Sequence, residues 1–100
     1  MASTPEGKVK AIIDAYLKSL KNCWFCKPVS LGMGTHGIPD YIGCFRGHFF
    51  AIEAKKPGGK PTALQVMQMK GIEQAWGWAG VISDPQSLAV FKDWVELMSR

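Results

Sequence analysis

The sequence contains the run His48-Phe49-Phe50-Ala51-Ile52-Glu53-Ala54-Lys55, which has the length and composition of a β-strand. Side chains alternate across a strand, so Phe50, Ile52 and Ala54 are expected to pack together into the core. Glu53 and Lys55 then share the opposite face with Phe49 and Ala51. This pattern predicts an acid and a base side by side at the rim of a cleft.

The preceding run, residues 38–45, is a second strand-like segment that contains Asp40. Arg46-Gly47 separates the two runs and has the composition of a tight turn, so the runs predict a β-hairpin. Asp40 can approach Glu53 across this hairpin, although the sequence leaves the register of the two strands open.

Periodicity in the rest of the chain predicts three helices and two further strands. The helices are expected from Pro5 to about Asn22, from Thr62 to about Trp76, and from Asp84-Pro85 onwards. The other strands are expected over residues 23–31 and 79–83, with glycine-rich loops around Gly32, Gly34 and Gly37 and over residues 57–61. The order α-β-β-β-α-β-α predicts a mixed α/β sheet with flanking helices in one domain, residues 1–100.

Each predicted helix carries an apolar stripe. Ser3-Thr4-Pro5 supplies a cap and a first-turn proline for the first helix. The second helix is expected to place Leu64, Met67, Gly71, Ile72 and Ala75 on one side. The apolar residues of the last helix fill about half of its circumference, which is typical of a helix with more than one neighbour.

Composition bounds the kind of protein. The chain has 100 residues, a net charge of +4 and an apolar fraction of 47%, which is typical of a globular domain. The positive charge favours a polyanionic partner without proving one. No apolar run approaches the ~20 residues that span a bilayer, and residues 1–10 are too polar for a signal peptide. We therefore expect a soluble, intracellular protein.

The chain has three cysteines, Cys23, Cys26 and Cys44, and this odd number argues against a disulfide framework. Cys23-Trp24-Phe25-Cys26 has the spacing of a zinc half-site. Residues three apart on a strand point to opposite faces, however, so buried thiols are the favoured interpretation.

Asp40, Glu53 and Lys55 together predict hydrolytic chemistry. Two carboxylates held close together repel each other unless a cation neutralises them, and oxygen ligands suit Mg²⁺ or Mn²⁺. Such a metal polarises a phosphoryl oxygen and activates a water molecule. Lys55 is expected to orient that water or to stabilise the transition state. The competing interpretation is a solvated strand edge with a weak Glu53–Lys55 surface pair.

The ordered set Gly37-Ile38-Pro39-Asp40-Tyr41-Ile42, Phe50-Ala51-Ile52-Glu53-Ala54-Lys55-Lys56-Pro57, Gly59-Lys60-Pro61-Thr62 and Gln65 resembles the VRR-NUC family of the PD-(D/E)XK nuclease superfamily. The similarity runs from the helix containing Glu6 to Gly80. This resemblance implies a restriction-endonuclease-like core and a metal-dependent endodeoxyribonuclease.

The resemblance also implies roles for individual residues. Asp40 and Glu53 match the metal-binding carboxylates, and the main-chain carbonyl of Ala54 would be a further ligand. Lys55 matches the catalytic lysine, Gln65 matches the glutamine on the following helix, and Glu6 matches an acid of the first helix.

Glu6 and Gln65 also have competing structural interpretations. Ser3-x-x-Glu6 and Thr62-x-x-Gln65 are both capping-box patterns, in which the acid or amide folds back on the helix start. Glu6 also extends the apolar stripe of the first helix, where an acid would need a partner such as a metal. Lys56 and Lys60 flank the glycine-rich loop beside the proposed site and are candidate phosphate contacts.

The small, standalone, phage-like members that the chain resembles act on branched DNA, as Holliday-junction resolvases working as homodimers. A homodimer is therefore expected, with the last helix and Trp76, Trp78 and Trp94 as candidate interface, in a bacterial or phage-infected cell. The alternatives are a flap or nicking nuclease and a non-catalytic DNA-binding module. The competing interpretation of the tryptophans is that they pack into the core of this small domain and are not available for an interface.

Overall fold

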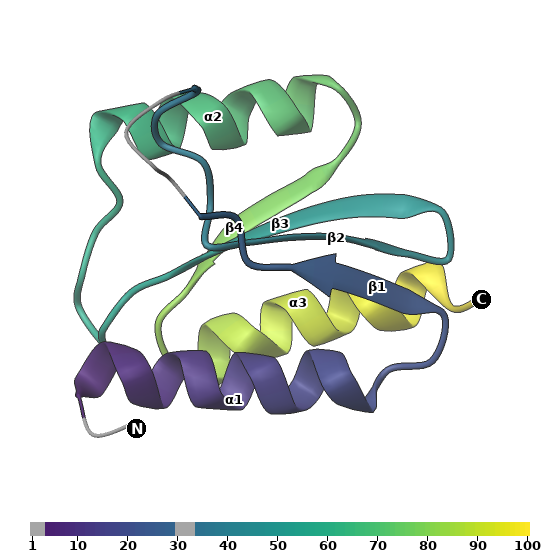
Figure 1. The fold of residues 1–100 in the computed structure, drawn as a ribbon. Helices are drawn as coiled ribbons and strands as arrows, with labels where there is room; N and C mark the ends of the chain where they lie inside the picture. The colour runs from purple at the N-terminus through teal and green to yellow at the C-terminus, as the bar shows by residue number, and fades with distance from the viewer. Residues whose placement is uncertain (1–3, 30–33) are drawn as a thin grey trace.

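The fold of the chain is given by a computed structural model that describes residues 4–29 and 34–100 (Figure 1). Within these residues the elements are α1 (Pro5–Ser19), β1 (Cys23–Cys26), β2 (Tyr41–Phe45), β3 (His48–Ala54), α2 (Ala63–Gln74), β4 (Trp78–Ile82) and α3 (Pro85–Met98). The predicted order α-β-β-β-α-β-α is confirmed.

Helix starts were easier to predict than element ends. Thr62 and Asp84 cap α2 and α3 as expected, and Thr4 caps α1 by accepting a hydrogen bond from the Gly7 N–H. α1 ends before the predicted Asn22, which adopts a positive φ of 57° in the connection to β1. β1 stops at Cys26, whereas the prediction extended it across Pro28, a residue that cannot donate to a sheet.

The other strands differ from their predicted bounds by a few residues. β2 begins at Tyr41 rather than Ile38, so Asp40 lies just before the strand. β3 ends at Ala54, and β4 begins one residue earlier than expected. Ser3, Leu31 and Gly32, which also entered the sequence predictions, lie outside the described residues.

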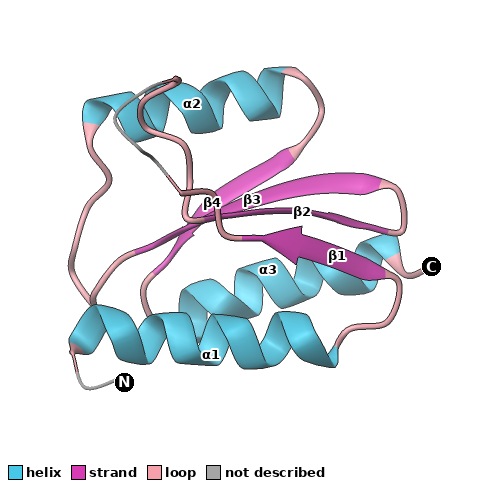
Figure 2. Cartoon of the chain, viewed as in Figure 1, coloured by secondary structure: helices cyan, strands magenta, loops and turns pink. Residues whose placement is uncertain are grey.

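The sheet is mixed, with the strand order β1-β2-β3-β4. β1, β2 and β3 pair antiparallel, and β4 joins β3 in parallel. Figure 2 shows α1 and α3 on one side of the sheet and α2 on the other. The chain thus forms a three-layer arrangement around a single sheet.

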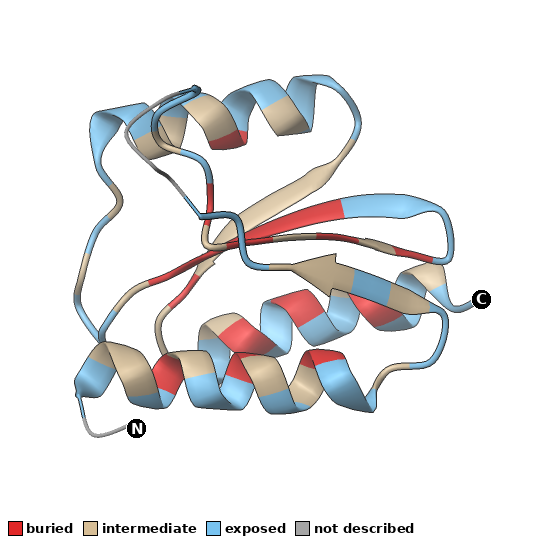
Figure 3. Cartoon of the chain, in the orientation of Figure 1, coloured by how far each residue is buried: buried red, intermediate tan, exposed pale blue. Residues whose placement is uncertain are grey.

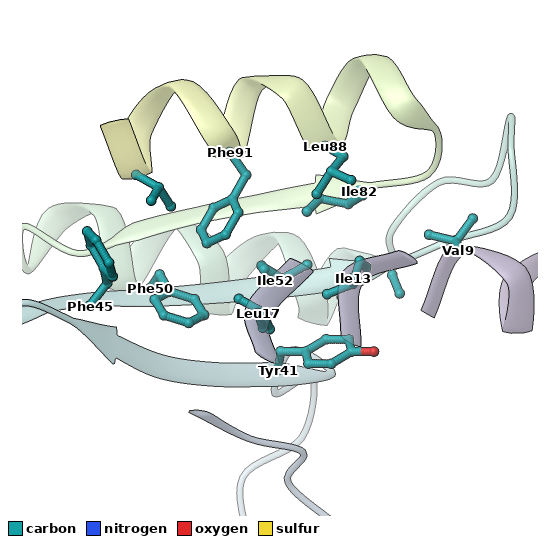
Figure 4. Close-up of a cluster of buried hydrophobic side chains, with 12 residues drawn as sticks. Val9, Ile13, Leu17, Tyr41, Phe45, Phe50, Ile52, Ile82, Leu88 and Phe91 are labelled. Atoms are coloured by element: carbon teal, nitrogen blue, oxygen red, sulfur yellow. The ribbon is translucent and has the colours of Figure 1, made fainter. Parts of the chain in front are cut away.

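The core lies between the sheet and the α1–α3 layer (Figures 3 and 4). Phe50, Ile52 and Ala54 of β3 belong to it, which confirms the predicted face of that strand. Val9, Ile13 and Leu17 of α1 and Leu88, Phe91 and Val95 of α3 pack against the same face, together with Tyr41, Phe45 and Ile82. Burial of these side chains is the main force that holds the helices on the sheet.

The tryptophans divide between the core and the surface. Trp94 stacks on Phe91 with ring centroids 5.6 Å apart, and Trp78 lies against both rings, at 5.0 Å from Phe91. The core therefore absorbs two of the three tryptophans proposed for an interface. Trp76 is 96% exposed at the end of α2, where it adopts a positive φ of 72°.

Within residues 4–29 and 34–100, α2 is the one helix of the opposite layer. α2 packs mainly against β4 and β3, so among the described helices none packs chiefly on β1 and β2 from this side. On the apolar side predicted for α2, Leu64 and Met67 are exposed, whereas Met69 is the buried residue of this helix. A helix that covers half a sheet buries a narrower stripe than its apolar content predicts.

Among the helices of the described residues, each is too short or too polar to cross a membrane.

Candidate metal and phosphodiester site

The β2–β3 hairpin brings Asp40 and Glu53 together. Tyr41 pairs with Ile52 in antiparallel register, so Asp40, which precedes Tyr41, lies opposite Glu53, which follows Ile52. Asp40 Oδ2 accepts a hydrogen bond of 2.9 Å from the main-chain N–H of Ala54. The register that the sequence left open therefore places the two carboxyl groups at the same end of the hairpin.

Glu53 is the buried acid of this site, with only 2% of its surface exposed. Its Oε2 accepts a hydrogen bond of 3.0 Å from Gln65 Nε2 and lies 3.4 Å from Lys55 Nζ. Its Oε1 is buried and has no hydrogen-bond partner among the described residues. An unpaired carboxylate oxygen in a buried position is costly, and so indicates a missing donor or cation.

The surroundings of Glu53 favour its neutral form. Burial, followed by the charge of Asp40, raises the pKa of Glu53 to about 7, and Lys55 only partly offsets these effects. The ionised side chain therefore lacks sufficient compensation from the protein alone. A divalent cation would supply it.

Gln65 combines both of its proposed roles. Its Oε1 accepts a hydrogen bond of 2.8 Å from the Thr62 N–H, and its own N–H donates to Thr62 Oγ1 at 3.2 Å, which completes a capping box. Because the carbonyl end of the amide is engaged by the cap, the NH₂ end points to Glu53. The two interpretations that competed in the sequence are thus satisfied by opposite ends of one amide.

Lys55 and the turn that follows lie beside the carboxylates. The Lys55 side chain is 18% exposed, and its main-chain N–H donates to Ile82 O at 3.0 Å, which fixes the end of β3 against β4. Residues 56–59 form a turn closed by a 2.8 Å bond from Gly59 N–H to Lys56 O, with Gly58 at φ +80°. Lys56 and Lys60 at its two ends are exposed, as phosphate contacts must be.

The loop before Asp40 rests on the start of α2. Gly37 has φ +81°, and a Cβ there would lie 2.7 Å from the main-chain carbonyl of Leu64, so no other residue fits this approach. The His36 carbonyl accepts a hydrogen bond of 3.2 Å from Gln68 Nε2, and the His36 side chain is exposed. A cavity of about 330 Å³ opens between this loop, Val29 and Gln65.

The structure does not bring Glu6 into a metal-binding group. The prediction that Glu6 extends the buried stripe of α1 is wrong, because its side chain is 46% exposed and lies 3.4 Å from Lys10 Nζ. Thr4 caps the helix, and Ser3, the first residue of the proposed Ser3–Glu6 box, lies outside the described residues. Within residues 4–29 and 34–100, no three acidic, histidine or cysteine side chains are grouped to hold a metal.

Asp14 is the α1 acid that the sequence interpretation missed. It accepts hydrogen bonds of 2.7 Å from Tyr41 Oη and 2.7 Å from Lys27 Nζ. Tyr41 is fully buried and directly follows Asp40, so Asp14 ties α1 to the start of β2. In the sequence Asp14 falls among the polar residues of the helical pattern, and only its position one residue after Ile13 indicates a role beside the core.

The donor set fits a hard cation rather than zinc. Asp40 and Glu53 supply carboxylate oxygens, and Mg²⁺ commonly binds through one or two carboxylates while it keeps several water molecules. The Ala54 main-chain N–H donates to Asp40. The prediction that the Ala54 carbonyl is a further metal ligand stays a prediction. Cys23, Cys26 and Cys44 are free thiols, but they are partly exposed rather than buried as the sequence predicted.

Searches of protein-family models and of curated proteins found no match to this sequence. The function of this chain is therefore inferred from the geometry around Glu53.

Proposed function

We propose that this protein is a divalent-metal-dependent endodeoxyribonuclease that hydrolyses phosphodiester bonds in DNA. One observation carries the proposal: buried Glu53 has one oxygen bonded to Gln65 and near Lys55, and the other oxygen without a partner, beside Asp40. A solvated strand edge would not bury its acid in this way. The solvated-edge interpretation of Glu53 and Lys55 therefore has less support.

Each side chain has a role consistent with its contacts. Asp40 and Glu53 would hold Mg²⁺ or Mn²⁺, which when bound polarises a phosphoryl oxygen and lowers the pKa of a bound water. Lys55 supplies positive charge at the mouth of the site, where it stabilises negative charge on the phosphate or orients the attacking water. Gln65 holds Glu53 Oε2, which leaves Oε1 free for the cation.

The element order and the mixed sheet support a restriction-endonuclease-like core and membership of the VRR-NUC family. In such a core the hairpin that carries Asp40 and Glu53 is followed by a helix and a parallel strand, as α2 and β4 follow here. The glycine at position 37, the acid at 40 and the Glu53-Ala54-Lys55 motif are brought to one end of the sheet.

The substrate that we propose is branched DNA, with the four-way junction first and flaps second, cut by a homodimer. A two-fold dimer places two sites symmetrically, which suits paired cuts on a near-symmetric junction. Val90 and Leu97 on the outer side of α3 are exposed and lie seven residues apart, so they offer apolar surface for such a contact.

The test is a panel of labelled four-way junction, flap, nicked duplex, linear duplex and single-stranded DNA, incubated with Mg²⁺, Mn²⁺ or EDTA. We expect metal-dependent cleavage that is strongest on the junction. Cleavage of nicked or single-stranded DNA alone would favour the simpler nuclease. Binding without cleavage under every metal condition would favour a non-catalytic DNA-binding module.

A further inference from the structure

An exposed aromatic row crosses the sheet on the same face as Glu53. Trp24 of β1 pairs with Cys44 of β2, and Cys44 pairs with Phe49 of β3. Residues directly opposite each other in an antiparallel pair share a face. Phe49 lies four residues before Glu53, so strand alternation places both on the α2 side of the sheet.

Both rings of this row are accessible. Trp24 is 64% exposed and Phe49 is 42% exposed, because α2 lies over β4 and β3 and leaves β1 and β2 uncovered. One edge of the Phe49 ring lies against Gly77, where a Cβ would come within 3.0 Å of it. A hollow of about 160 Å³ opens beside this edge, lined by Phe49, Ile72, Ala75 and Gly77.

The row is within reach of a strand of nucleic acid bound at the carboxylates. Four residues along β3 correspond to about 13 Å, and two strand spacings correspond to about 10 Å. A DNA strand with a phosphate beside Glu53 therefore needs only a few nucleotides to reach Phe49 and then Trp24. The two features lie on one continuous face of the sheet.

The charges that flank the row are complementary to phosphate. The Arg46 N–H donates to Asn22 O at 3.0 Å, so the β2–β3 turn adjoins the connection between α1 and β1. Lys21 and Arg46 in these two segments are exposed, and neither forms an ion pair with another described residue. β1 and β2 contain no acidic residue.

We propose that the aromatic row, Trp24, Cys44 and Phe49, binds unpaired nucleotides, with a base stacked on the rings and the backbone against Lys21 and Arg46. This site rests on the proposed nuclease function and extends its substrates to branched DNA that carries a single-stranded segment beside the cut, such as a flap. Aromatic rings with neighbouring cations suit this ligand, because every base has a face that stacks and every nucleotide a charge. A purely apolar contact with a second copy would not need Lys21 and Arg46.

The experiment measures binding in EDTA, so that no cleavage occurs. Fluorescence anisotropy follows the titration of a labelled short oligothymidine and of a blunt-ended duplex. Trp24→Leu keeps an apolar side chain but removes the aromatic face, whereas Trp24→Tyr keeps the face. We expect Trp24→Leu and Phe49→Leu each to weaken oligothymidine binding by about tenfold, Trp24→Tyr to stay near wild type, and duplex binding to change little.

Ile12→Ala is the matched control, since Ile12 is 37% exposed on α1, on the other side of the sheet. Equal oligothymidine affinity for wild type, Trp24→Leu and Phe49→Leu, each with an unchanged thermal unfolding midpoint, would overturn the proposal. A wild-type dimer that Trp24→Leu converts to a monomer in sedimentation would instead assign the row to contact between copies.

Cleavage assays keep this result separate from the nuclease proposal. If Trp24→Leu cleaves DNA with single-stranded tails at the wild-type rate, the proposed aromatic site would be refuted and the proposed nuclease function would stand. If oligothymidine binding depends on Trp24 but no substrate is cleaved, the nuclease proposal would be refuted and the proposed binding site would stand.

Discussion

Gln65 connects the first turn of α2 to Glu53: its amide NH₂ donates to Glu53 Oε2 at 3.0 Å while its amide oxygen accepts from the Thr62 N–H at 2.8 Å. The cap therefore determines which end of the amide faces the acid. A residue that preserved the cap but lacked the NH₂ group would present the wrong chemistry to Glu53.

Gln65→Glu tests this relationship. Glutamate preserves the capping box, yet it places a second carboxylate against Glu53 and should raise the pKa of Glu53 further. We expect loss of most cleavage near neutral pH, with partial recovery at higher metal concentration. Initial cleavage rates across a pH series provide the measurement. Gln74→Glu, an exposed change on the same helix, should cleave like wild type, and an identical loss there would indicate a general effect of charge on α2.

The pKa of Glu53, raised to about 7 from 4.5, predicts a pH-dependent stability without metal. The folded state binds the proton more tightly than the unfolded state, so this stabilisation is present at low pH and is lost as pH rises from about 4.5 to about 7. The change is on the order of 2 to 3 kcal/mol in the free energy of unfolding.

Urea denaturation in EDTA across this range measures the effect. Two other carboxyls titrate lower: hydrogen bonds from Lys27 and Tyr41 outweigh burial and lower the pKa of Asp14, and the Ser87 N–H lowers that of Asp84. Glu53→Gln should flatten the profile, and Mg²⁺ should stabilise the wild type at the upper end. A Glu53→Gln profile as steep as that of the wild type would assign the dependence to other groups.

Lys55→Ala should abolish cleavage while leaving the fold and much of the DNA affinity intact, because Lys55 touches Glu53 at the mouth of the site rather than the core. Asp40→Asn should reduce metal binding and cleavage together. Calorimetric titration of Mn²⁺ and a junction-cleavage assay measure the two effects. Lys18→Ala, at an exposed lysine on α1, is the control and should retain most activity. Wild-type cleavage rates in both site variants would refute the assigned site.

DNA affinity should fall steeply with salt between ~50 and ~200 mM, since phosphate contacts release counterions. Lys60→Ala should lower the slope of log affinity against log salt by up to about one unit. Lys92, which lies over the Tyr16 ring on the other side of the sheet, supplies the control variant Lys92→Ala. An affinity insensitive to salt, or equal slopes for the two variants, would argue against a phosphate contact at Lys60.

A homodimer should appear in sedimentation at micromolar concentration as about twice the 11.0 kDa chain mass. With Trp78 and Trp94 in the core, exposed Val90 and Leu97 are the apolar surface of α3 that remains for this contact. Val90→Asp should therefore yield monomers without unfolding the chain. A wild-type protein that is monomeric both alone and on a junction would leave the nicking enzyme as the better proposal.

Much of the fold was predictable because local signals marked it. Proline, glycine and the capping residues Thr62 and Asp84 set the boundaries, and period-two alternation in β3 identified its core face. The buried side of α2 was not predictable, because it depends on how much of the sheet that helix covers. The end of β1 was likewise determined by Pro28 rather than by apolar content.

In the candidate site, the residues could be identified but not their contacts. The pairing of Asp40 with the Ala54 N–H depends on a strand register that no local signal fixes. Glu6 and Asp14 show the same difficulty on α1, since both occupy helical positions near the core and only packing against Tyr41 distinguishes them. Trp24 and Phe49 could be recognised as neighbours of Cys44 only once the register of β1, β2 and β3 was known.

The parallel pairing of β3 with β4 has a consequence during synthesis. The end of β3 is fixed when the Lys55 N–H bonds to Ile82 O, and Glu53 pairs with Val81, yet these partners are added after the whole of α2. Contacts that are distant in sequence form only after the chain between them has been closed into a loop. A growing chain that has not yet reached β4 therefore carries Asp40, Glu53 and Lys55 without a supported site. The site is therefore completed only once β4 has been synthesised and paired with β3.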